Sequence, residues 1–165
     1  MINAGFTEAL LGLLAIILVV AAIIDVRTFT ISNGLNLTVA LLAPLYWWSV
    51  GLPLWPEAVI QVAVAIAVFG ALALAFYIGM MGGGDVKLAA ALALWFSPAT
   101  TLKFLVIMSL AGGALTLLVL LIHKKRGNPP LDAQGNPARP EVPYGVAIAF
   151  GALWILAQRF LNQFA

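Results

Sequence analysis

Apolar residues occur along this chain in long runs that are separated by short polar segments. We distinguish six runs and expect each to form a helix; they cover about residues 9–24, 35–50, 58–81, 86–96, 100–122 and 142–160. A helix rises about 1.5 Å per residue and a bilayer core is about 30 Å thick, so most of these runs can cross a membrane. The pattern therefore predicts an all-α, polytopic membrane protein, a bundle of six transmembrane helices with a short fourth helix.

The fourth run differs from the others in its length and in what precedes it. Its eleven residues, 86–96, rise only about 16 Å as a helix, about half of a bilayer core. Three consecutive glycines and Asp85 come directly before it. Each glycine in a helix interior costs up to about 1 kcal/mol relative to alanine, so the glycines predict a break. A carboxylate at a break inside a membrane protein is costly, which makes Asp85 a candidate functional residue.

Polar segments mark the ends of the runs. Residues 25–34 combine β-branched residues with Ser, Asn and Gly, which predicts a loop after the first run. The longest polar segment, about residues 123–141, is rich in Pro, Gly and Asn and predicts an irregular loop. No polar stretch is long enough for a second domain, so we expect residues 1–165 to form a single transmembrane domain.

The basic residues predict how the chain is oriented, because cytoplasmic loops carry the excess of Lys and Arg. If all six helices cross, the loops after the first, third and fifth runs share one side of the membrane. These loops hold six of the eight basic residues: Arg27, Lys87, Lys124, Lys125, Arg126 and Arg139. We therefore expect this side in the cytoplasm and both termini outside. A re-entrant fourth segment would place the basic loop at 123–141 outside, against the same rule.

This topology places Asp25 and Asp85 at the cytoplasmic ends of the first and third runs. They then lie at a similar depth, where helix packing can bring them together. Two carboxyl groups about 3 Å apart cannot both ionise easily and share a proton. The ionised group can take a proton from water that attacks a peptide carbonyl, and the protonated group can donate one to the product. Gly82 and Gly84 lack a Cβ, so another backbone, such as a substrate strand, can approach closely.

The composition excludes several other classes of function. Hydrophobic residues make up 64% of the chain and charged residues 8%, against about 25% charged in soluble domains. The chain has no cysteine, which excludes a disulfide framework and a cysteine-ligated zinc site. One histidine, His123, is too few for a histidine-rich metal site, and the basic residues are too few for a nucleic-acid surface. We expect no metal, no cofactor and no nucleic-acid partner.

Three segments together resemble one protein family. Residues 82–85, Gly-Gly-Gly-Asp, resemble the GxGD signature of membrane-embedded aspartic proteases, and residues 85–88 extend the resemblance to the type IV prepilin peptidases. Residues 25–27 and 31–33 look like the first aspartate motif of that family, D-x-R followed by I-P-N, with Ser32 where proline is usual. Residues 143–149 look like its last helix. The resemblance covers nearly the whole chain, in order.

The resemblance implies an enzyme of the bacterial cytoplasmic (inner) membrane with Asp25 and Asp85 as its catalytic pair, acting at the cytoplasmic face. Its implied reaction removes the short basic leader from a prepilin or pseudopilin that continues as an apolar helix. The supporting or substrate-binding candidates are Gly82, Gly84, Lys87, Arg27 and Asn33. The cysteine-bearing domain of the bifunctional members is absent, so we expect a peptidase without N-methylation. The short length resembles the stand-alone enzymes of Flp-type, tight-adherence pili, and membrane lipid is the other expected partner.

Two alternative functions remain compatible with the residues. The first is a small proton-coupled transporter that uses Asp85 and Lys87 on a broken helix. A transporter of that kind predicts a second broken helix, yet Gly112 and Gly113 have no charged neighbour. The second is a membrane assembly factor without catalysis, in which the two carboxyl groups lie too far apart to share a water molecule.

Overall fold

The computed structural model describes residues 4–126 and 141–162, and these residues form helices and no strands. The six α-helices are α1 (Ala4–Thr28), α2 (Asn33–Val50), α3 (Val59–Tyr77), α4 (Gly83–Ala93), α5 (Pro98–Arg126) and α6 (Tyr144–Leu161). A short π-helical segment, η1 (Leu54–Ala58), leads into α3. The predicted all-helical fold is confirmed.

Four segments of the described residues are long and apolar enough to cross a membrane: α1, η1 together with α3, α5 and α6. The helices α2 and α4 do not meet these criteria of length and composition. The chain is therefore a multi-pass membrane protein, and the crossing of all six helices stays a prediction. The structure confirms that the fourth helix is short, with eleven residues.

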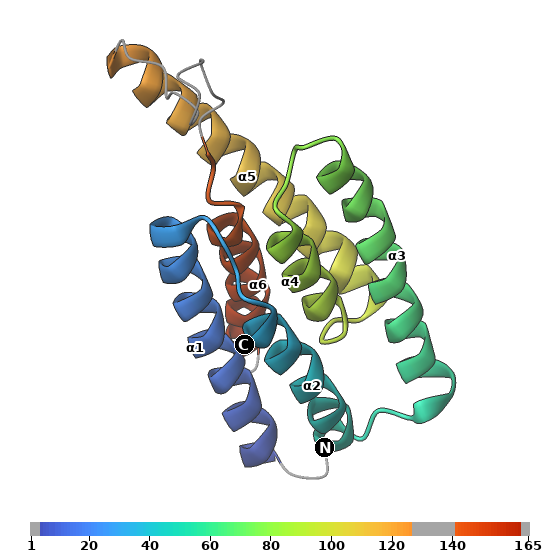
Figure 1. Cartoon of the computed structure of the whole chain (residues 1–165). Coiled ribbons are helices and arrows are strands. Elements are labelled where there is room, and N and C mark those ends of the chain that lie inside the picture. Colours follow the sequence, from blue (N-terminus) through green and yellow to red (C-terminus); the bar gives the residue numbers. More distant parts are fainter. Residues whose placement is uncertain (1–3, 127–140, 163–165) are drawn as a thin grey trace.

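Helix α4 lies at the centre of the bundle. It packs against α2, α3 and α6, while α1 packs against α2 and α6, and α5 packs along α6 (Figure 1). Eight of the eleven residues of α4 are buried, and its Leu88 and Leu92 are fully enclosed with Leu14 and Leu18 of α1. Among the six α-helices of the described residues, α4 is therefore both the shortest and the most buried, and it carries Asp85 on its first turn.

The ends of several helices differ from the prediction. Helix α1 continues to Thr28, so Asp25 lies in a helical turn and not in the predicted loop; the backbone N–H of Phe29 still donates to the carbonyl oxygen of Asp25 at 2.8 Å. Helix α4 begins at Gly83, three residues before the predicted start. The first amides of a helix lack intrahelical acceptors in any case, so glycines are tolerated there better than in its interior.

The predicted loop at 123–141 is wrong at its beginning. Helix α5 continues through His123 to Arg126, and the ring Nδ1 of His123 lies 2.9 Å from the carbonyl oxygen of Val119 in the preceding turn. The four residues from 123 to 126 thus extend the helix instead of opening the loop. Most of the predicted loop, residues 127–140, lies outside the described residues.

Candidate active site

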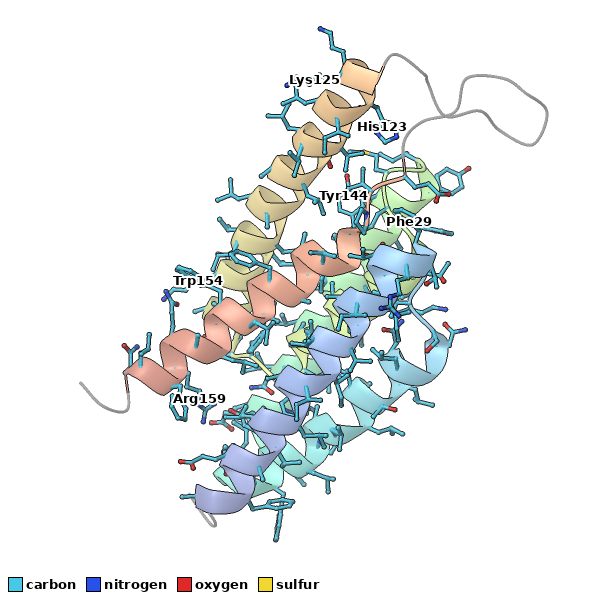
Figure 2. The ribbon with its side chains drawn as sticks, turned by 90° about the vertical axis from the view of Figure 1, so that its left-hand side faces the viewer. Phe29, His123, Lys125, Tyr144, Trp154 and Arg159 are labelled. Atoms are coloured by element: carbon cyan, nitrogen blue, oxygen red, sulfur yellow. The ribbon has the colours of Figure 1, made fainter. Side chains whose placement is uncertain are left out.

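Asp25 and Asp85 meet at one end of the bundle. Asp25 lies in the last turn of α1 and Asp85 in the first turn of α4, and their side chains are 2% and 7% exposed. Ile31 lies against both Gly84, the neighbour of Asp85, and Gly145, which contacts the Asp25 carboxyl, so both aspartates lie around this one residue. Figure 2 shows the same end of the molecule from the side, where Phe29 follows α1 and Tyr144 opens α6. Two residues sixty positions apart are thus brought together by the packing of their helices.

The Asp25 carboxylate is held by the first turn of α6. The backbone N–H of Gly145 donates to Oδ2 of Asp25 at 2.7 Å, and the amide of Val146 also hydrogen-bonds to this carboxylate. The first amides of a helix lack intrahelical acceptors, although the N–H of Val146 also donates to the carbonyl oxygen of Pro143 at 3.1 Å. The helix dipole places partial positive charge at the same end. The beginning of α6 therefore supplies a site for a negative charge on Asp25.

Asp85 is only partly paired. The backbone N–H of Gly82, the N-cap residue of α4, hydrogen-bonds to the Asp85 carboxylate, as in the returning half of a capping box. Its other oxygen, Oδ1, is buried and has no hydrogen-bond partner among the described residues. A buried oxygen without a partner is costly and uncommon in native structures, and such an atom is often explained by a role in chemistry. Asp85 thus keeps one oxygen free for a water molecule or a substrate.

Ile31, in the turn between α1 and α2, fits between two glycines of the site. A Cβ at Gly84 would lie 2.7 Å from the backbone oxygen of Ile31, and a Cβ at Gly145 would lie 2.7 Å from its Cδ1 and 2.8 Å from Cγ of Asp25. We expected the glycines before Asp85 to admit a substrate backbone. The structure shows that the backbone beside Gly84 is the chain's own, so this glycine permits the close packing of the site itself.

Asn36 is a site residue that the sequence interpretation missed. It is 5% exposed on α2, and its Nδ2 donates to the carbonyl oxygen of Gly84 at 2.9 Å. Its Oδ1 is buried and has no partner among the described residues. A polar amide within the apolar second run was the available signal. Asn36 fixes the backbone immediately before Asp85 and presents an unused acceptor next to it.

The remaining predicted site residues, Lys87, Asn33 and Arg27, have exposed side chains at the edge of the candidate site. Lys87 donates to Oδ1 of Asn33 at 2.7 Å, and both side chains are exposed. This bond joins the start of α2 to α4, and Lys87 forms no ion pair with Asp85 in the described part of the chain. Arg27 is exposed on the last turn of α1, where a cation favours the negative end of the helix dipole. The structure thus separates these three residues from the buried carboxyl pair.

An apolar groove runs away from the site between α2, α3 and α4. Its volume is about 570 Å³, and Asn33, Asn36 and Lys87 line it together with apolar residues such as Ala40 and Ala91. No group of three or more His, Cys, Asp or Glu side chains in the described residues is arranged to hold a metal ion.

The fold and the site define a multi-pass helical membrane protein with a buried pair of carboxyl groups at one end of the bundle. The model of the type IV leader peptidase family matches residues 12–117, more than half of the chain. The chain therefore belongs to the type IV leader peptidase family, which confirms the resemblance drawn from its three segments. The match includes both aspartates, Asn36 and α4, whereas α6, which binds Asp25, lies beyond it. No curated protein and no solved structure matches this chain.

Proposed function

We propose that this protein is an aspartic endopeptidase in which Asp25 and Asp85 cleave the leader from a prepilin. Membership of the family supports a leader peptidase function in general. The observation that supports the finer proposal is the pair of buried carboxyl groups at one end of the bundle, where Oδ1 of Asp85 has no hydrogen-bond partner among the described residues. This is the arrangement that acid–base hydrolysis of a peptide bond requires.

In the proposed reaction, Asp25 is the base and Asp85 the acid. Two amides of α6 hydrogen-bond to Asp25 and stabilise its ionised form. Oδ1 of Asp85 is buried without a donor among the described residues, which favours the protonated carboxyl. Asp25 takes a proton from water as the water oxygen attacks the scissile carbonyl carbon. Asp85 donates its proton to the carbonyl oxygen. When the tetrahedral diol collapses, the C–N bond breaks and the nitrogen receives the proton that Asp25 took from water. One diol hydroxyl returns its proton to Asp85, and the leader leaves with a new carboxyl group that ionises in water.

The proposed substrate is a Flp-type prepilin or pseudopilin with a short basic leader and an apolar helix. The apolar groove between α2, α3 and α4 is suited to hold that helix, and its lining includes Asn36, which bonds to the backbone just before Asp85. The free Oδ1 of Asn36 can accept an N–H from the extended segment at the cleavage site, which would otherwise be unpaired in a membrane. Lys87 and Asn33 join the two helices at the mouth of the groove.

The proposed location is the bacterial inner membrane, with the aspartates toward the cytoplasm and both termini outside. The excess of basic residues in the loops on the side of Asp25 and Asp85 supports this orientation. We also propose that the activity is that of a peptidase without N-methylation.

Substitution of each aspartate tests the proposal. Asp25→Asn and Asp85→Asn are each co-expressed with a Flp-type prepilin, and leader removal is measured as a shift in substrate mass. We expect each variant to lose about 1,000-fold in rate, the order of effect of a lost general acid or base. Glu57→Gln, which replaces an exposed carboxyl of η1, is the matched control and keeps the full rate. Full processing by either aspartate variant would contradict the proposal.

A further inference from the structure

A second cavity lies beyond the C-terminal end of α4. Its volume is about 610 Å³, and residues of α1, α2, α3, α5, α6 and the turn from α4 to α5 line it. With eleven residues, α4 rises only about 16 Å, so its position in the bundle is left partly unfilled. Figure 1 shows α4 ending well above the lower ends of α1, α2 and α3. The cavity is a consequence of the same short helix that carries Asp85.

This cavity is separate from the candidate active site. Arg159, which lines it, is fourteen residues beyond Gly145 along α6, a rise of about 21 Å. Figure 2 shows Tyr144 and Arg159 at opposite ends of that helix. A ligand bound in the cavity therefore does not contact Asp25 or Asp85.

Two cations line the cavity and no acidic side chain does. Lys103 comes from α5 and Arg159 from α6. Arg159 donates to the hydroxyl of Tyr46, and its guanidinium lies 5.5 Å from the centre of that ring. Neither cation forms an ion pair within the described residues. Basic side chains at the end of a membrane helix often extend toward water alone. These two line one cavity from two different helices, so both can reach a single anion.

Gln61 adds a third polar feature. Its side chain is 7% exposed on α3, lines the cavity, and has a buried Oε1 with no partner in the described part of the chain. A buried acceptor without a donor is costly. A ligand that carries a hydroxyl group as well as an anionic group would satisfy both Gln61 and the cations.

An apolar groove adjoins the cavity. It lies between α1 and α6, has a volume of about 350 Å³, and shares Leu11, Leu156 and Arg159 with the cavity. Its lining is otherwise apolar apart from Glu8 near the start of α1. A polar cavity that continues into an apolar groove matches a molecule with a charged head and a hydrocarbon chain.

We propose that the cavity binds the head group of an anionic phospholipid with hydroxyl groups, such as phosphatidylglycerol. The phosphate contacts Lys103 and Arg159 in charge-assisted hydrogen bonds, and a glycerol hydroxyl donates to Oε1 of Gln61. An acyl chain lies in the groove between Leu11 and Leu156. The lipid fills the half of the bundle that α4 does not reach.

Native mass spectrometry of the full-length protein in detergent tests this site. The protein is titrated with phosphatidylglycerol, with phosphatidylcholine of the same acyl chains, or with glycerol phosphate. We expect one phosphatidylglycerol to be retained in preference to phosphatidylcholine. Lys103→Gln and Arg159→Gln each weaken its retention by roughly tenfold, because each removes one charge-assisted contact. Lys124→Gln with Lys125→Gln, at the far end of α5, is the control and leaves this lipid bound.

The outcomes separate the possible ligands. Equal retention of the two lipids, or unchanged retention in Lys103→Gln, would overturn the proposal. Glycerol phosphate that displaces the lipid at equal concentration would show a site for soluble phosphate instead, and a dimer whose formation expels the lipid would show that a second copy fills the groove. Arg159→Gln also loses the contact with Tyr46, which can destabilise the fold. Lys103 is exposed, so Lys103→Gln is expected to fold and keeps the test valid.

Discussion

At the end of the bundle that holds Asp25 and Asp85, backbone segments approach so closely that a Cβ at Gly84 would lie 2.7 Å from the carbonyl oxygen of Ile31. At the other end, the same bundle leaves a cavity of about 610 Å³, lined by two cations and by a buried amide oxygen without a partner among the described residues. The first end is filled by the protein's own atoms, and the second leaves room for a molecule from outside.

The short helix α4 explains both ends. Its first turn is packed among α2, α6 and the turn at Ile31, which holds Asp85 in one place. Its last turn stops halfway through the bundle and leaves the cavity. Chemistry requires groups held within a fraction of an ångström, whereas a lipid head group tolerates looser contacts. The difference predicts that small changes near Asp85 have large effects on cleavage, and that changes around the cavity affect lipid retention.

Gly84→Ala is expected to have the largest effect of the packing changes. The new Cβ must displace the backbone of Ile31, and a shift of about 1 Å in a catalytic group can cost about 100-fold in rate. Gly113→Ala on α5 is the control, because a Cβ there meets nothing within 4 Å and alanine favours a helix. Leader removal and thermal unfolding in detergent measure both variants. A Gly84→Ala enzyme with the wild-type rate would show that this close contact does not hold Asp85.

Asn36→Leu is expected to have an intermediate effect. It leaves the carbonyl oxygen of Gly84 without its 2.9 Å donor, a loss of about 2 kcal/mol, or roughly 30-fold in rate if the loss falls on the transition state. If Asn36 positions Asp85, kcat should decrease more than KM increases. If its Oδ1 mainly binds substrate, the main change should be an increase in KM. Thr38→Val, an exposed change on the same helix, controls for general effects on α2. Unchanged kcat and KM in Asn36→Leu would show that Asn36 has no role in cleavage.

Ala40→Trp is expected to have the smallest effect of the three. A tryptophan at Ala40 occupies the groove between α2, α3 and α4, where the apolar helix of the substrate is proposed to lie. A loss of about 1 kcal/mol of substrate binding corresponds to roughly a fivefold rise in KM, with little change in kcat. Ala63→Trp, on an exposed face of α3 outside the groove, is the control. Equal KM values for the two variants would place the substrate elsewhere.

The sequence predicted the helices and the short fourth segment well, because long apolar runs and glycine breaks are local signals. It did not predict that α1 continues through Asp25 to Thr28, since β-branched residues and Ser there resembled a loop. The rest depends on contacts between distant residues. Gly145 lies 120 positions from the carboxylate that it binds, and Asn36 lies 48 positions from Gly84. No local pattern shows such contacts, nor the cavity that appears only when α4 is packed among its longer neighbours.

The most direct measurement is a double-substitution cycle on the two aspartates. The rates of leader removal are compared for Asp25→Asn, Asp85→Asn and the variant that carries both. Groups that act as one catalytic unit show strongly non-additive losses, so the double variant should be no slower than either single variant. Losses that multiply, or a single variant that cleaves the prepilin at the wild-type rate, would contradict a catalytic pair formed by Asp25 and Asp85.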